Sequence, residues 1–469
     1  MDAEQKENGI NMRPGRKGRK GRKGTLDMTA GNPAVLLLRF SLPLILGNLF
    51  QQLYTFVDTV IVGQKLGVSA LAALGAAEWP SFMMFGFIQG LTQGFSIGIS
   101  RSFGEGKSHL VQQGIFQAFC ASAGAAVIAA AVGQGMLAPL LRLLRTPEEL
   151  FGMTCLYLGI LYIGIPVSFA YNMLAAILRA FGNSQAPLVA VITASFSNIF
   201  FDILFVMKWE MGIRGAAYGT LLSQACSVIY CIAALSRIRQ ARVEPCNRKI
   251  RVRMLAEQIK LGVPMGLQNI ITAAGGLVVQ SVVNGFGILF LAGYTAANKL
   301  YGLLETAASS YGYAISTYTA QNAGAGKRER IRSGLLTALV IGAVTAYLVS
   351  FIMVVWGKPV LGLFIADSQA EAGAALDIGY QFLCVLAVFF PLLYALYILR
   401  SCIQGMGNSM MPMLSSLMQV IMRIVCAVAL TKRIGNTGVF WGEIMAWLGA
   451  DVFLAAVLLW RYRTDSCAK

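Results

Sequence analysis

Long apolar segments dominate the chain, and short polar segments separate them. Most of these segments have about 20 residues or more, the length that a helix needs to cross a ~30 Å hydrocarbon core. A helix is the expected form, because backbone polar groups in lipid must be satisfied within their own segment. We therefore predict twelve membrane-spanning helices, over about 35–63, 68–100, 112–141, 151–178, 187–207, 212–236, 259–284, 288–320, 334–356, 376–400, 411–431 and 437–460.

The composition supports a membrane protein rather than a soluble one. Hydrophobic residues make up 57% of the chain and charged residues 13%, whereas soluble domains are about 25% charged. The alternating pattern of a membrane β-barrel does not occur. The predicted fold class is therefore an all-α polytopic membrane protein.

Several classes of chemistry find no support in the sequence. Nine cysteines and one histidine, His109, show no spacing typical of a metal site. Gly104–Lys107 (GEGK) lacks the P-loop pattern, and no strand precedes it, so we do not expect nucleotide binding. We expect no cofactor, and any energy source has to be an ion gradient.

The distribution of positive charge predicts the topology. The net charge is +17, and most Lys and Arg residues lie in the N-terminal segment, the even-numbered loops and the C-terminus. By the positive-inside rule, both termini are expected in the cytoplasm. We predict a multi-pass protein of the bacterial cytoplasmic (inner) membrane.

Charge and hydropathy also divide the chain into regions. The run Arg13–Lys23 is basic and Gly-rich, which favours a disordered, topology-setting tail over a site for anionic lipid. A second basic stretch near the middle of the chain is expected to link two halves. The predicted regions are a basic cytoplasmic tail (1–30), an N-terminal six-helix lobe (31–236), a linker (237–258), a C-terminal six-helix lobe (259–462) and a short tail (463–469).

An internal repeat relates the two halves. Matching motifs recur at an offset that stays between 220 and 225 residues. Each half has six spans, so the repeats are parallel, as in transporters that alternate access around a central cavity. The glycines are expected to form turns and helix ends. The matched pairs are Pro43 with Pro264, Gly104–Lys107 with Gly324–Lys327, Gly182–Ser184 with Gly407–Ser409, and Gly212 and Gly215 with Gly435 and Gly438.

Ionisable residues inside the spans are functional candidates, because a charge at mid-bilayer costs about 2.5–3.5 kcal/mol on insertion scales. The candidates are Asp58, Glu78, Asp202, Lys299, Glu305, Arg423 and Asp451. For Glu78 and Asp451 the sequence indicates no role.

In the N-terminal half these residues form a polar group with their neighbours. Asp58 shares a helix face with Gln51 and Tyr54, and Asp202 shares one with Asn198. With a hydroxyl from Thr220, such a group would bind a hard monovalent cation such as Na⁺, or a proton. The alternative is that these groups only form hydrogen bonds between helices. Two acids favour the functional interpretation.

The C-terminal half differs at the matching positions. Arg423 occupies the repeat position of Asn198, and Ala427 lies near that of Asp202. Lys299, Glu305 and Arg423 are expected either to neutralise one another or to contact the substrate.

Motifs in both halves resemble those of the multidrug and toxic compound extrusion (MATE) family, closest to its bacterial DinF-like branch. The resemblance implies two six-helix bundles around a V-shaped cleft, and export of amphipathic, often cationic compounds in exchange for Na⁺ or H⁺. It places the coupling site at Asp58, Asn198, Asp202 and Thr220. The matching residues are Gly31–Pro33, Phe40–Pro43, Asn48, Gln51–Tyr54, Val57–Thr59, Val62–Gly63, Asn198, Asp202 and Gly215–Ala217.

We therefore expect a secondary antiporter that exports amphipathic, mainly cationic compounds. Gln51, Tyr54 and Asn172 are expected to line its substrate cleft. One chain is sufficient for this mechanism, so a monomer is expected. The alternative is a flippase for a lipid-linked saccharide from the same superfamily. A membrane enzyme would need a nucleophile–base pair, and the sequence shows none. A receptor would be expected to carry a soluble domain.

Overall fold

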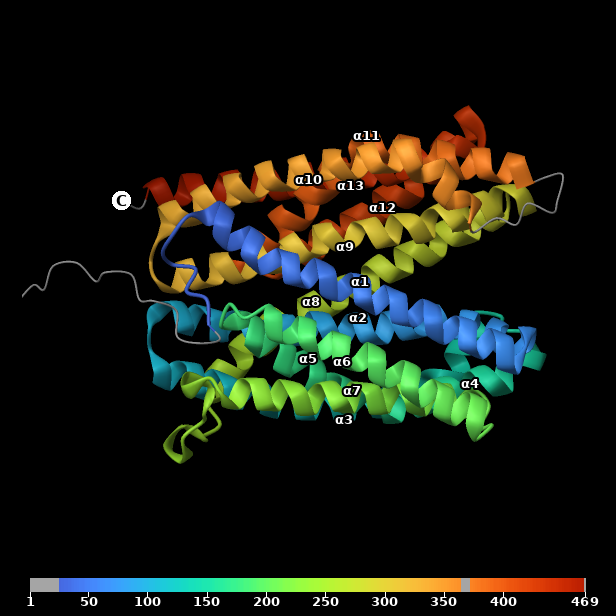
Figure 1. Ribbon diagram of the computed structural model, residues 1–469. Helices are drawn as coiled ribbons and strands as arrows, with labels where there is room; N and C mark the ends of the chain where they lie inside the picture. Colours follow the sequence, from blue (N-terminus) through green and yellow to red (C-terminus); the bar gives the residue numbers. More distant parts are fainter. Residues whose placement is uncertain (1–24, 364–371, 468–469) are drawn as a thin grey trace, which may run out of the picture.

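Helices make up nearly all of the described structure, and Figure 1 shows them as two layers of long, roughly parallel helices. The computed structural model describes residues 25–363 and 372–467, so most of the predicted basic tail lies outside it. The first half contains α1 (Pro33–Leu66), α2 (Val68–Glu105), α3 (Ser108–Leu143), α4 (Glu148–Ile163), α5 (Ile165–Ala180), α6 (Gln185–Asp202), the π-helical turn η1 (Ile203–Lys208) and α7 (Ile213–Ser236). The linker contains the short 3-10 turns η2 (Arg239–Ala241) and η3 (Pro245–Asn247). The second half contains α8 (Val252–Asn284), α9 (Ile288–Gly324), α10 (Arg328–Gly362), α11 (Ala372–Gly405), α12 (Met410–Ile434), the 3-10 turn η4 (Gly435–Thr437) and α13 (Gly438–Cys467).

These elements confirm the twelve predicted spans. The fourth span is α4 and α5 together, which meet at an angle of 50° because Gly164 breaks the helix just before Pro166. Nine helical stretches of the described chain are long and apolar enough to cross a membrane, if α12 and α13 are taken together as one stretch. The remaining span, α9, carries the charged residues Lys299 and Glu305.

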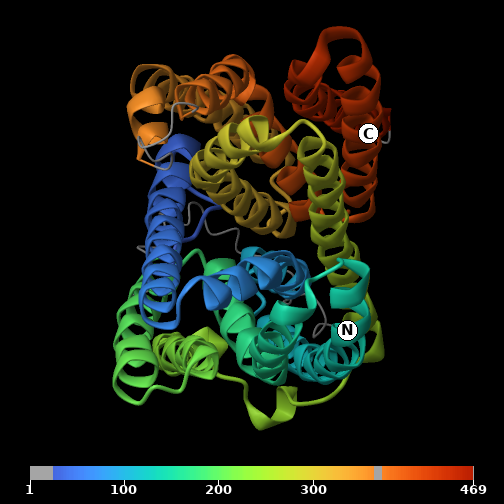
Figure 2. The ribbon, with the colours of Figure 1, turned by 90° about the vertical axis from the view of Figure 1, so that its right-hand side faces the viewer.

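The buried apolar side chains form two large cores, one for each half of the chain, but α1 and α8 each reach across. The first half of α1, from Leu36 to Leu44, packs in the core of the second half, whereas Val62 near its end packs in the core of the first. In the same way Gln258 of α8 donates to the carbonyl of Gly114 on α3. Figure 2 shows both helices extending from one lobe to the other.

Close contacts between α2 and α8 join the lobes. A Cβ atom on Gly90 would overlap the backbone of Met265, and one on Gly94 would overlap the backbone of Gly262. Glycine at these positions therefore allows the two helix backbones to approach directly. This contact fixes α2 and α8 as the shared wall between the lobes.

The residues just before α1 form a second connection between the lobes. Leu26 donates its backbone N–H to Phe181 at 3.0 Å, and Met28 donates to the side chain of Gln321 at 2.8 Å. Met28 and Gln321 are fully buried. Residues 25–30 were expected in the disordered tail. That prediction is wrong for this stretch, because its apolar side chains find a buried position between α5 and α9.

The repeat predicted from the sequence is visible in the backbone. Gly106 and Gly326 have φ of 75° and 70°, and Gly182 and Gly407 have φ of 78° and 87°. These left-handed conformations end helices at equivalent points of the two halves, where a residue with a Cβ would be strained. The prediction that these glycines form turns is confirmed.

Candidate functional site: a central cavity beside a buried carboxyl pair

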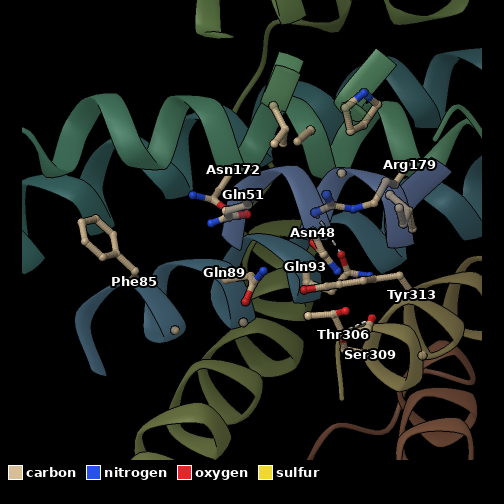
Figure 3. A pocket seen from close by; sticks show the side chains of 18 of the residues that line it. Asn48, Gln51, Phe85, Gln89, Gln93, Asn172, Arg179, Thr306, Ser309 and Tyr313 are labelled. Atoms are coloured by element: carbon tan, nitrogen blue, oxygen red, sulfur yellow. Dashed lines mark hydrogen bonds between the residues drawn. The ribbon is translucent and has the colours of Figure 1, made fainter. Parts of the chain in front are cut away.

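A cavity of about 530 Å³ lies between the two lobes. Side chains from α1, α2 and α5 to α9, together with α11, line it. Because both lobes line the cavity, a substrate bound there would contact both lobes. Figure 3 shows part of the lining and labels Asn48, Gln51, Phe85, Gln89, Gln93, Asn172, Arg179, Thr306, Ser309 and Tyr313.

Neutral polar groups dominate this lining. Gln51, Tyr54 and Asn172, the predicted cleft residues, all belong to it. The charged side chains among the lining residues are Arg179, Glu305 and Arg400. Aromatic rings between these groups provide apolar surface, so the cavity suits molecules with both polar and apolar parts.

Beside the cavity, the predicted coupling residues come together from three helices. The carboxyl groups of Asp58 on α1 and Asp202 on α6 are close enough to interact electrostatically with each other. Asn198 and Asp202 are fully buried. Thr220 on α7 completes the group and also lines the cavity. The structure therefore brings together all four residues named from the sequence.

Several polar atoms of this group have no hydrogen-bond partner among the described residues. Within the described chain, no hydrogen bond reaches either carboxylate oxygen of Asp202, Oδ1 of Asp58 or the side-chain amide of Asn198. Two carboxylates can share a hydrogen bond only when one is protonated, and otherwise repel each other in a low dielectric. The arrangement therefore has room for a proton or for a cation that oxygen atoms would ligate.

Local sequence explains how Asp202 fits. A Cβ atom on Gly219 of α7 would overlap Oδ1 of Asp202, so glycine lets the carboxyl lie against the α7 backbone. On the α4 side, the hydroxyl of Tyr157 interacts with Thr220 and lies near Asp58. Beyond the site, Lys65 at the end of α1 donates to Glu210 at 2.8 Å and lowers the pKa of that exposed carboxyl.

The charged groups of the second half are arranged differently from the prediction. Arg423 forms an ion pair with Glu443 of α13 at 2.6 Å. Glu305 accepts a hydrogen bond from Tyr397 at 2.8 Å. Lys299 is exposed and forms no ion pair in the part of the chain that the structure describes. Of the expected neutralisation, Glu305 interacts with Arg423 only at longer range, because Glu443 is the closer partner of Arg423.

The two residues left without a role differ in burial. Glu78 is exposed on α2. Asp451 on α13 is buried, and neither of its carboxylate oxygens has a hydrogen-bond partner among the described residues.

Four residues of these sites were not singled out from the sequence. Tyr157 and Glu443 lie inside predicted spans, and Glu443 occupies the repeat position of Thr220, which was the signal available. Arg179 and Arg400 lie at the ends of the fourth and tenth predicted spans, where an arginine is typical of a cytoplasmic loop. Both instead belong to helices and face the cavity.

A two-lobed bundle of twelve spans, with a cavity between the lobes and unpaired acids in the membrane, is the architecture of a secondary transporter. The MatE family model matches residues 43–204 and 264–429, one segment in each half. The chain therefore belongs to the MatE family of transporters. Its relatives are transporters rather than enzymes.

Curated relatives carry related names. "Probable multidrug resistance protein YpnP" of Bacillus subtilis is 30% identical over 439 residues, which cover 93% of this chain and 96% of that protein. "FAD transporter" of Shewanella oneidensis is 24% identical over 340 residues, or 71% of this chain and 75% of that one. The lipid-linked saccharide flippase raised from the sequence receives no support from these relatives.

Solved structures confirm the fold. One described as the outward-facing conformation of a multidrug resistance MATE family transporter superimposes with a TM-score of 0.85 at 23% identity. The match covers 96% of this chain and 99% of that one. At this identity the likeness establishes the shared fold.

Proposed function

We propose that this protein is a secondary active antiporter that exports amphipathic small molecules in exchange for Na⁺ or H⁺. The observation that carries the proposal is the pair of neighbouring carboxyl groups, Asp58 and Asp202, beside the cavity. Within the described residues, Oδ1 of Asp58 and both carboxylate oxygens of Asp202 have no hydrogen-bond donor. Burying two acids is costly, and an ion from solution would offset that cost. The names of the multidrug-resistance relatives support a small-molecule cargo.

The proposed cycle depends on two states of the lobes. In the state described here, buried contacts of Met28, Phe181 and Gln321 close the end that carries both described chain ends. We assign that end to the cytoplasm, because the basic loops lie there. Ion binding at Asp58 and Asp202 then repacks α1, α6 and α7 and releases cargo outward. Coupling follows if ion and cargo prefer different states, which is the only way a ligand shifts such an equilibrium.

The site offers groups for either coupling ion. Oxygen atoms from Asp58, Asn198, Asp202 and Thr220 suit Na⁺, which prefers hard oxygen ligands. A pair of neighbouring carboxyl groups equally suits a single proton. One chain supplies the whole cavity, so a monomer is sufficient for transport.

The direct test is gradient-driven dye transport by the full-length protein in proteoliposomes. Wild type, Asp202→Asn and the exposed control Glu78→Gln are compared under separately imposed Na⁺ and pH gradients. We expect one gradient to drive dye movement in wild type and control, and movement to be lost in Asp202→Asn. If Asp202→Asn moved the dye at the wild-type rate, the carboxyl pair would not be the coupling site.

The cargo class expected from the sequence was mainly cationic. Among the residues that line the cavity, two arginines and one glutamate carry charge, which does not favour cations alone. One relative is named as a transporter of FAD, a compound with phosphate groups. We therefore extend the proposed cargo to amphipathic molecules of other charge types.

A further inference from the structure

Two buried arginines face the central cavity, one from each lobe. Arg179 is on α5 and Arg400 on α11, and the residues are 221 positions apart, within the offset of the internal repeat. Their side chains are 9% and 6% exposed. The duplicated fold therefore places a guanidinium group at equivalent points on the two sides of one cavity.

Each guanidinium group is incompletely paired. Arg179 lies over the ring of Tyr313, with 4.9 Å from its Cζ atom to the ring centroid, and makes a long hydrogen bond of 3.5 Å to Gln93. Figure 3 shows this side chain together with Gln93 and Tyr313. Arg400 donates to Gln419 at 3.0 Å. The Nε atoms of both arginines have no partner in the described chain.

No carboxylate neutralises either arginine at close range. Among residues 25–363 and 372–467, neither Arg179 nor Arg400 has an acidic oxygen within 4.0 Å, although Arg423 does. Glu305, the acid in the cavity, interacts with Arg400 only at longer range and accepts a hydrogen bond from Tyr397. Asp451 is near Arg400 but does not line the cavity. A buried guanidinium without an anion is costly, so both groups are available to a ligand.

The neighbouring residues connect the two arginines within the same cavity. Tyr397 lies near both Arg400 and Tyr313, and Tyr313 stacks on Arg179. A guanidinium presents a fork of donors that matches a carboxylate or phosphate group. The tyrosine rings beside it offer apolar surface to the body of the same ligand.

We propose that Arg179 and Arg400 form an anion-binding subsite that holds the carboxylate or phosphate group of an amphipathic substrate. The inference rests on the proposed transport function, because it assigns a substrate class to the same cavity. The subsite explains why the lining carries more basic than acidic side chains. It also predicts that a cargo molecule with an acidic group contacts both lobes at once.

Equilibrium binding tests the subsite separately from transport. The probes are rhodamine B, which carries a carboxylate, and its ethyl ester, which has the same ring system without that charge. Full-length protein in nanodiscs of phosphatidylcholine is titrated with each dye, and fluorescence anisotropy gives the Kd. In wild type we expect rhodamine B to bind about tenfold more tightly than the ester, a difference of ~1.4 kcal/mol.

The arginine variants decide whether this preference comes from the subsite. Arg179→Gln and Arg400→Gln should each reduce the preference severalfold without weakening the binding of the ester, and retained ester binding also reports folding. Arg400→Lys should keep part of the preference, and Lys299→Gln, exposed on α9, should keep all of it. Equal binding of the two dyes in wild type, or an equal loss of both in the variants, would overturn the proposal.

Two further arms separate the sources and the two proposals. Loss of rhodamine B binding in nanodiscs containing phosphatidylglycerol would assign the anion to a lipid headgroup, whereas unchanged binding would assign it to a soluble substrate. Dye preference without gradient-driven movement would support the subsite and count against antiport. Gradient-driven movement of both dyes without a preference for rhodamine B would support antiport and count against the subsite.

Discussion

The guanidinium group of Arg423 lies 2.6 Å from a carboxylate oxygen of Glu443. By the internal repeat, these two residues stand where the first half carries Asn198 and Thr220. The second lobe therefore contains a fixed cation at the place where the first lobe leaves polar oxygens unpaired. In our proposal, only the first lobe needs an ion from solution, and only that lobe couples transport to a gradient.

Removal of either partner of this ion pair should destabilise the protein. Arg423→Asn or Glu443→Thr alone leaves one charge buried without its partner, which typically costs about 3–5 kcal/mol. The double variant Arg423→Asn with Glu443→Thr recreates the residues of the first lobe and leaves no charge behind. We expect it to lose less stability than the sum of the single variants.

Thermal unfolding of the purified protein in detergent measures these differences. The control is Lys358→Gln, which removes an exposed ion pair with Asp377 and should change stability by less than about 1 kcal/mol. Strictly additive losses in the double variant would show that the pair contributes nothing as a pair.

The fit of Asp202 against α7 gives a second prediction. Gly219→Ala should impair ion-driven transport, because the added Cβ would occupy the position of the Asp202 carboxyl. Gly124→Ala on α3 is the matched control, since no atom lies within 4 Å of its added Cβ. Transport rates under the coupling gradient are compared in proteoliposomes. Equal rates in the two variants would contradict the packing described for Asp202.

Tyr157 provides a third prediction, which separates ion binding from cargo binding. Tyr157→Phe removes the hydroxyl that interacts with Thr220. If that hydroxyl holds Thr220 in place at the ion site, the half-saturating ion concentration should rise about fivefold, the effect of one neutral hydrogen bond of about 1 kcal/mol. The affinity for dye should not change.

Tyr162→Phe on the same helix is the control for this variant. Its hydroxyl makes only a long bond of 3.4 Å to the carbonyl of Pro80, so ion dependence should stay at the wild-type value. A rise of similar size in both variants would indicate a general effect of α4.

The fold and the first-lobe site could be read from the sequence for physical reasons. Apolar spans have a length imposed by the bilayer, and buried acids such as Asp58 and Asp202 are rare enough to be conspicuous. Helix periodicity placed Asn198 and Asp202 on one face, and the structure agrees. Both signals are local in the sequence.

Contacts between distant helices were the part that the sequence did not reveal. The partner of Arg423 lies on α13, and nothing local distinguishes Glu443 from Glu305 as that partner. Arg179 and Arg400 occupy span ends, where a basic residue is common in any membrane protein. The burial of Met28 depends on a gap between α5 and α9 that only the folded chain forms.

Gln321 leads to the last prediction, because it joins the segment before α1 to both lobes at the closed end. Its side chain accepts from the backbone of Met28 at 2.8 Å and donates to the carbonyl of Ala180 at 3.0 Å. Gln321→Leu keeps a similar volume and removes both hydrogen bonds, each worth about 1 kcal/mol. We expect this end to open more often, because the loss of the two hydrogen bonds destabilises the closed state relative to the open state.

Thiol accessibility measures the opening. Ser316→Cys, on the buried lining of the cavity, is introduced together with Cys246→Ser, which removes the exposed cysteine of the linker. A membrane-impermeant maleimide added on the side of the closed end should label Cys at position 316 about tenfold faster in Gln321→Leu. Gln280→Leu on α8, whose side chain donates to Asn284 of its own helix, is the control and should label slowly. Equally slow labelling of Gln321→Leu would show that the contacts between α2 and α8 close this end without help from the segment before α1.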